Sequence, residues 1–76
     1  MIINRHIFIE DYESKEIHSV DMSSNGEYFD VNINLLINGE YETAATFELD
    51  TIENAIRYGK RLAEKYNVPY SEYHGD

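Results

Sequence analysis

The chain has 76 residues, no cysteine and one proline, and its 15 acidic and six basic side chains give a formal net charge of −9. This length suits a single small domain over 1–76, and a hydrophobic content of 42% is too high for a disordered acidic tail. Without thiols a disulfide framework is excluded, and no apolar run has the length of a secretory leader or a membrane span, so we expect a cytoplasmic protein.

The first expected strand covers about residues 5–11, with a turn over 12–15. Its side chains are expected to divide with Ile7 and Ile9 toward the core and His6 and Phe8 away from it.

The first hairpin is marked by Asn25-Gly26, because both residues of an Asn-Gly pair tolerate positive φ. A two-residue loop there suits the apolar pattern and turns His18, Val20 and Met22 toward the core. The expected pairs are Met22 with Phe29, Val20 with Val31 and His18 with Ile33.

The second hairpin is marked by Asn38-Gly39 between two alternating runs, 28–35 and 41–49. A two-residue loop would oppose apolar to polar residues, so we expect a three-residue loop, 37–39, with Gly39 in a left-handed bulge position. The expected pairs are Leu35 with Tyr41, Ile33 with Thr43, Val31 with Ala45 and Phe29 with Phe47.

After Leu49 the apolar period changes to about 3.6, and Asp50 and Glu53 have the spacing of a capping box. We expect a helix over about 51–66 that ends at Asn67, followed by a tail, 67–76, ordered only through Tyr70. The expected apolar stripe consists of Ile52, Ala55, Ile56, Gly59, Ala63 and Tyr66, with Leu62 at its margin.

These elements predict an α+β domain in which a four-stranded antiparallel meander, about 5–49, carries one C-terminal helix on one face. The other sheet face, here called the open face, is left uncovered. Its expected residues are Asp21, Asp30, Asn32, Asn34, Glu42, Thr46 and Glu48, with Phe8, Ile17 and Tyr28 among them.

Catalytic and metal-binding patterns are not found in the sequence. The histidines His6, His18 and His74 are expected on the open face, the inner face and the tail, so they do not converge on a metal. His18 is expected at the core margin with a local partner such as Asp11. No nucleophile, phosphate loop or calcium loop has the required neighbours, and we expect neither an enzyme nor a cofactor.

The charge is uneven, because the first fifty residues hold eleven of the acidic side chains and only two basic ones. Such a surface repels nucleic acid and can meet a basic protein surface, although acidity also simply keeps a small domain soluble. Of the seven tyrosines, Tyr41 and Tyr66 are expected in the core, and Tyr12, Tyr28 and Tyr58 are expected to be exposed. The predicted partner-binding set is Tyr28 as the anchor with Asp21, Asp30, Glu42 and Glu48 around it.

The stretch from Ser24-Asn25-Gly26 through Asn38-Gly39 to Phe47-Glu48-Leu49-Asp50-Thr51-Ile52-Glu53 resembles part of a small type I-F anti-CRISPR protein. The strand and helix order, with Ala55-Ile56-Arg57-Tyr58-Gly59-Lys60-Arg61-Leu62-Ala63, also resembles many small bacterial proteins. Neither resemblance assigns a role to a residue. The first implies a phage or mobile-element inhibitor that binds a nucleic-acid-handling complex by presenting acidic groups in place of phosphates.

The sequence supports two hypotheses about function. One is a non-enzymatic acidic module that occupies a basic, nucleic-acid-binding surface of a protein or ribonucleoprotein without touching nucleic acid or membrane. The alternative is a structural or regulatory homodimer formed through an edge strand, since an uncovered strand can pair with a second copy.

Overall fold

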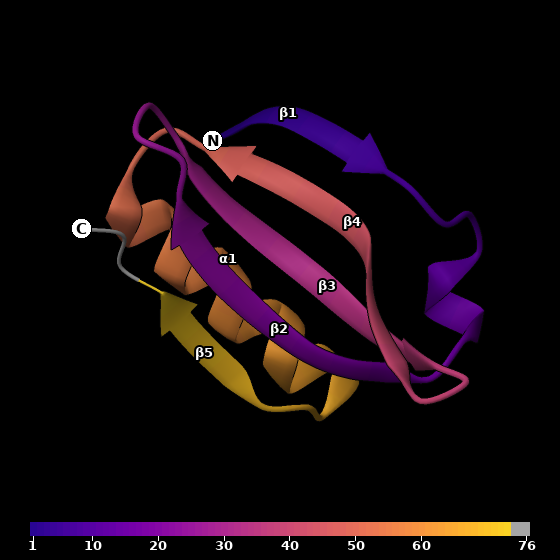
Figure 1. The fold of residues 1–76 in the computed structure, drawn as a ribbon. Helices are drawn as coiled ribbons and strands as arrows, with labels where there is room; N and C mark the ends of the chain where they lie inside the picture. The colour runs from indigo at the N-terminus through magenta and orange to yellow at the C-terminus, as the bar shows by residue number, and fades with distance from the viewer. Residues whose placement is uncertain (74–76) are drawn as a thin grey trace.

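The computed structural model describes residues 1–73, which form one five-stranded sheet and one α-helix (Figure 1). The two-layer α+β class is confirmed, but the sheet is mixed and its strand order is β1-β4-β3-β2-β5 rather than a four-stranded meander. The elements are β1 (Ile2–Ile7), the 3-10 turn η1 (Tyr12–Ser14), β2 (Ile17–Ser24), β3 (Phe29–Ile37), β4 (Glu40–Leu49), α1 (Ile52–Tyr66) and β5 (Tyr70–Tyr73).

The first strand lies at one edge of the sheet, antiparallel to β4 and not beside β2. The chain leaves it past β4, where the backbone amides of Phe8 and Ile9 donate to the carbonyl of Ala44 at 2.8 and 3.1 Å. The meander prediction fails here because alternation indicates which face a side chain occupies and not which strand lies alongside. The strand also begins earlier than expected, and Ile7, expected in the core, is 45% exposed.

The opposite edge is a short strand that the sequence did not predict. Residues 70–73 run parallel to β2, and the backbone amide of Val20 donates to the carbonyl of Pro69 at 3.0 Å. The expectation of a tail frayed beyond Tyr70 is therefore wrong for Ser71 to Tyr73. Residues 74–76, including His74, lie outside the described residues.

The first hairpin keeps the predicted core faces of Val20 and Met22 but not their partners. Val20 is opposite Ile33 and Met22 is opposite Val31, because residues 25–28 form a longer connection. The side chain of Asn25 organises this connection, since its Oδ1 accepts the backbone amides of Glu27 at 2.9 Å and Tyr28 at 2.6 Å.

A bulge between Ile17 and Ser19 reverses the prediction for His18. Ile17, expected on the open face, packs against the core, while His18 is exposed with its ring 4.7 Å from that of Tyr41. Its partner is therefore Tyr41 and not Asp11.

The second hairpin has a two-residue loop and not the predicted three-residue loop. Ile37 is opposite Glu40, and both loop residues have positive φ, 52° for Asn38 and 81° for Gly39. The three-residue loop is wrong, although the positive φ of Gly39 is confirmed.

One inserted residue inside β4 shifts the register of this hairpin. Asn34 is opposite Thr43 and Ile33 is opposite Ala45, so Ala44 is an extra residue without a counterpart on β3. Beyond it Val31 is opposite Phe47, and Phe29 is opposite Leu49 instead of Phe47.

The helix begins one residue later than the capping box predicts. Thr51 is the N-cap, its Oγ1 accepting the amide of Asn54 at 3.2 Å, whereas Asp50 accepts the Asn54 side chain at 3.1 Å. The predicted end at Asn67 is confirmed by its left-handed conformation.

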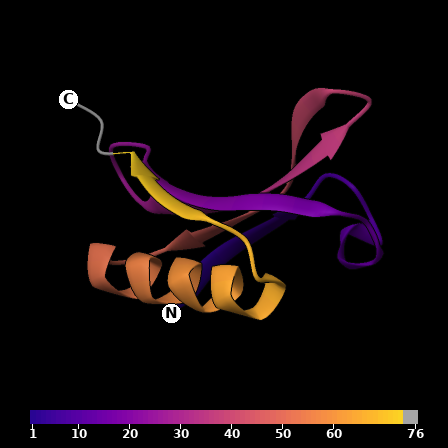
Figure 2. The same cartoon turned by 90° about the horizontal axis from the view of Figure 1, so that it is seen from below.

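The helix covers one face of the sheet and leaves the other open (Figure 2). The core between the layers is built from Val20, Met22, Val31, Ile33, Ala45, Phe47 and Leu49 of the sheet and Ala55, Leu62 and Ala63 of the helix. The predicted stripe is thus largely confirmed, with Leu62 buried rather than marginal.

Candidate functional site: the open sheet face

Side chains of β2, β3 and β4 form a continuous hydrogen-bonded array across the open face. Asp21 lies at its centre, its Oδ1 accepting from the amide of Asn32 at 2.8 Å and its Oδ2 from that of Asn34 at 2.6 Å. The carbonyl oxygens of these two amides accept in turn from Thr46 at 2.7 Å and Thr43 at 3.1 Å. Since each amide is fixed at both ends, the Asp21 carboxylate is held in one orientation.

A second array surrounds the directly opposed pair Asp30 and Glu48. The Asn25 amide bridges them, donating to Asp30 Oδ1 at 3.2 Å and to Glu48 Oε2 at 3.1 Å. Glu48 Oε1 also accepts from Asn4 at 2.9 Å and lies 3.4 Å from His6 Nε2. One loop asparagine thus holds two carboxylates side by side.

The two carboxyl groups of this pair are shifted in opposite directions. Hydrogen bonds from Asn4 and His6 hold the pKa of Glu48 below its ordinary value. Burial, and then the charge of Glu48, raises the pKa of Asp30. Most hydrogen bonds of the pair thus go to Glu48, whereas Asp30 bears the cost of burial and of the neighbouring like charge.

The negative charge of the open face is not neutralised within the described part of the chain. Among residues 1–73, Asp21, Asp30 and Glu48 accept hydrogen bonds from side-chain amides, Glu48 also contacts His6, and none of the three forms an ion pair with a lysine or an arginine. The basic side chains lie elsewhere: Arg5 faces Phe47 on the helix side, Lys15 precedes β2, and Arg57, Lys60, Arg61 and Lys65 are on α1. Charge is therefore segregated between the two layers.

Exposed apolar side chains lie beside these carboxylates. Phe8, 64% exposed, stacks against His6, while Leu36 and Tyr41 are opposite each other and 40% and 67% exposed. The β3–β4 hairpin, which carries Leu36 and Tyr41, rises away from the helix (Figure 2). A large exposed aromatic beside fixed polar groups is typical of binding surfaces.

A hollow of about 330 Å³ lies on the open face over β2, between Tyr41 of β4 and residues of β5. Asp21 forms part of its lining, and two exposed tyrosines contribute aromatic surface. The lining residues are His18, Ser19, Asp21, Asn34, Tyr41, Ser71 and Tyr73.

The predicted site residues are only partly brought together. Asp21, Asp30 and Glu48 lie on the open face, but Glu42 is opposite the buried Leu35 and so belongs to the helix side, because the Ala44 bulge reverses the faces on its two sides. Tyr28, expected at the start of the strand run 28–35, lies half-buried in the 25–28 connection and not in β3, and Glu48 is opposite Asp30.

Other tyrosines also lie on different faces from those that the sequence predicts. Tyr41, expected in the core, is the exposed aromatic of the hollow, whereas Tyr12 and Tyr58, expected to be exposed, pack against the core. The Asn38-Gly39 signal could have revealed Tyr41, because a two-residue loop places it on the open face. Tyr73 had no signal, since its strand is too short to show a period.

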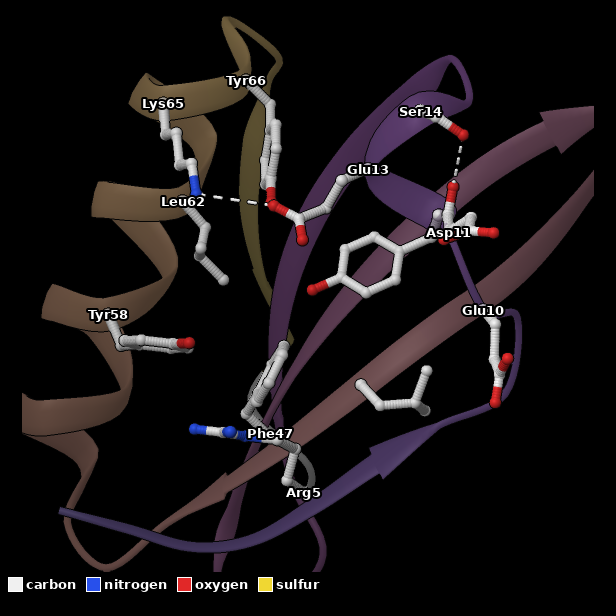
Figure 3. A pocket seen from close by; sticks show the side chains of 12 residues that line it. Arg5, Glu10, Asp11, Glu13, Ser14, Phe47, Tyr58, Leu62, Lys65 and Tyr66 are labelled. Carbon is white, nitrogen blue, oxygen red and sulfur yellow. Dashed lines mark hydrogen bonds and ion pairs between the residues drawn. The ribbon is translucent and has the colours of Figure 1, made fainter.

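A larger groove, of about 690 Å³, opens on the helix side beside β1 (Figure 3). On one side of this groove Glu13 accepts from the Tyr66 hydroxyl at 3.2 Å and pairs with Lys65 at 3.6 Å. Arg5 lies over the ring of Phe47, 5.8 Å from its centroid. Both cations of this groove are thus paired or stacked within the protein, and its other acidic residues, Glu10 and Asp11, are not held among residues 1–73 in a side-chain array like that of the open face.

No group of three or more His, Asp or Glu side chains among residues 1–73 could hold a metal ion. Over the same part of the chain, no helix has the length and apolar character needed to cross a membrane. Comparisons with protein-family models, curated proteins and solved structures gave no match for this chain.

Proposed function

We propose that this protein is a non-enzymatic binding module whose open face engages a positively charged surface of a protein or ribonucleoprotein. The observation that carries the proposal is that Asp21, Asp30 and Glu48 are held by side-chain amides, with His6 as a further contact of Glu48, and not by lysine or arginine. Carboxylates that are oriented and not paired with lysine or arginine attract a basic surface at long range and lose little conformational freedom on binding. Carboxylates already paired with lysine or arginine would be neutralised and would attract such a surface far less.

The partner surface that fits best is one that otherwise binds nucleic acid. Such surfaces array Lys and Arg to meet phosphates, and fixed carboxylates compete for the same cations. The protein then acts as a DNA mimic and an inhibitor, in keeping with the phage or mobile-element role implied by the anti-CRISPR resemblance.

The experiment uses the full chain as bait in a host lysate, in three forms. The first is the wild type, and the second carries Asp21→Asn, Asp30→Asn and Glu48→Gln. The third carries an equal charge change on residues outside the open face, Glu42→Gln, Glu53→Gln and Glu64→Gln. Melting curves establish that all three are folded.

Proteins retained by the wild type and the third form, but not by the second, are partners of the open face. Their purified complexes should weaken as salt rises, because exposed charges are screened. The proposal is overturned if the second form retains the same proteins as the wild type, or if only the third form loses them.

A homodimer is the second candidate, favoured by the character of β1. Within residues 1–73 this strand pairs on one side only, with β4, and it exposes Ile3 and Ile7 at 37% and 45%. An unpaired edge with exposed apolar residues can add a strand from a second copy. Light scattering at increasing concentration tests this, and a constant monomer mass would exclude it.

A further inference from the structure

The hollow between the β3–β4 hairpin and β5 combines a carboxylate, hydroxyl groups and aromatic surface in one small space. Asp21 lies between Asn32 on β3 and Ser71 on β5, the residues opposite it on its two neighbouring strands. Tyr41 and Tyr73, both lining the hollow, are 67% and 60% exposed.

The Asp21 carboxylate retains capacity to bind a further donor. Each of its oxygens accepts one hydrogen bond from an uncharged amide, and a carboxylate oxygen can accept two. No lysine, arginine or histidine among residues 1–73 forms an ion pair with it. A donor that enters the hollow therefore meets a full negative charge in a fixed orientation.

We propose that this hollow is the subsite that receives an arginine side chain of the partner, a step that rests on the proposed function. A planar guanidinium presents several donors in a fork that suits a carboxylate, and its faces stack on tyrosine rings. Ser19 and Ser71 add hydroxyl acceptors at the same site. Lysine carries a compact and strongly hydrated charge. It has no such fork of donors and gains less from the aromatic surface.

Tyr41 is positioned for this stacking role by its neighbour. The ring of His18 contacts it edge-on, with centroids 4.7 Å apart and planes at 64°. This contact orients an otherwise exposed side chain and leaves most of its surface to a ligand. The bulge at Ile17 that turns His18 outward thus contributes to the subsite.

The test is a titration of the isotope-labelled full chain with acetyl-Gly-Arg-Gly-amide, followed by NMR at low salt. Saturable shifts should appear at Ser19, Asp21 and Ser71, weaker ones with the lysine peptide, and none with the citrulline peptide, which keeps the shape without the charge. Asp21→Asn should weaken binding of the arginine peptide about tenfold, while Glu42→Gln, with the same change in net charge, leaves it unchanged.

A second pair of variants tests the aromatic surface. Tyr41→Ala should weaken binding of the arginine peptide several-fold. Phe8→Ala, which removes an exposed aromatic side chain outside the hollow, should leave this binding unchanged. The proposal is overturned if citrulline binds as well as arginine, or if Asp21→Asn and Glu42→Gln have equal effects.

Failure of the subsite and failure of the proposed function are distinguishable. If the arginine peptide does not bind in the hollow while partner capture still depends on Asp30 and Glu48, the subsite is wrong and the function stands. If the peptide saturates the hollow while no capture depends on the open face, the subsite stands and the proposed function is wrong.

Discussion

The ring of Tyr70 lies against Gly59, so closely that a Cβ at residue 59 would be 2.5 Å from the Cε1 atom of Tyr70. Tyr70 belongs to the edge strand β5, and Gly59 is on the buried face of α1. The glycine therefore makes room for the chain that returns from the helix to the sheet. Burial against the helix also raises the pKa of the Tyr70 hydroxyl, to about 12.

Gly59→Ala should destabilise the protein despite the better helix propensity of alanine. Relief of the glycine penalty is worth about 1 kcal/mol, whereas overpacking typically costs about 1 to 3 kcal/mol. In a Tyr70→Ala background the same change should become stabilising by up to about 1 kcal/mol. Urea denaturation of the four proteins in this cycle measures the coupling, and additive effects would exclude the contact.

Gly59 illustrates both what the sequence predicts and what it does not. Its position among small helix residues predicts a close approach, and this is what the structure shows. The element that approaches is β5, which was not predicted because a four-residue edge strand has too few residues for a period. The pairing of β1 with β4 was missed for a related reason, since it depends on the whole sheet and not on the local pattern.

The tight β3–β4 loop predicts a backbone effect at Gly39. Its φ of 81° is unfavourable for a β-branched residue, and a Cβ there would meet no atom within 4 Å, so sterics with the surroundings play no part. Gly39→Val should cost about 1 kcal/mol or more, and Gly39→Asn less, because asparagine tolerates this region. Thermal melts of the two variants decide the matter, and equal stabilities would argue against the loop geometry.

The bulge at Ala44 determines which acidic residues belong to the site. Strict alternation along 41–49 places Glu42 with Glu48, and the inserted Ala44 separates them onto opposite faces. A bulge inside a strand has no reliable signature in a single sequence, since the two alanines at 44 and 45 fit either face. Asp21 and Asp30, on strands whose alternation is unbroken at those positions, were placed correctly.

Asp30→Asn should stabilise the protein at pH 7. The raised pKa of Asp30 means that its charged form disfavours folding, so removing the charge should increase the free energy of unfolding, by an amount that solvent screening keeps small. The gain should shrink as pH falls through this raised pKa and vanish below the ordinary value of 3.8. Denaturation at several pH values measures it, and a gain that persists under acidic conditions would point to a cause other than charge.

Glu48→Gln should have the opposite sign. The lowered pKa of Glu48 means that its charged form favours folding, so the substitution costs stability at pH 7. This cost should fade as pH falls from the ordinary value of 4.5 through the lowered pKa. The same pH series measures it, and matching signs for Asp30→Asn and Glu48→Gln would contradict the unequal sharing of hydrogen bonds in the pair.

Once a partner is verified, substitutions of charged and of aromatic residues on the open face should affect different rate constants of binding. Asp30→Asn and Glu48→Gln should chiefly slow association, and the slowing should disappear at high salt, because these charges act at long range. Tyr41→Ala should instead accelerate dissociation, since a ring that stacks on a bound side chain acts only after contact.

Tyr28→Ala separates this site from the anchor that the sequence predicted. Tyr28 is half-buried in the 25–28 connection, whereas Tyr41 is 67% exposed beside Asp21, so the larger increase in dissociation rate should come from Tyr41. Stopped-flow or surface-based kinetics of the two variants measure both rates. A larger effect at Tyr28 would move the anchor to the far end of the face, next to Asp30 and Glu48, because Asn25, which holds the Tyr28 backbone, also bridges that pair.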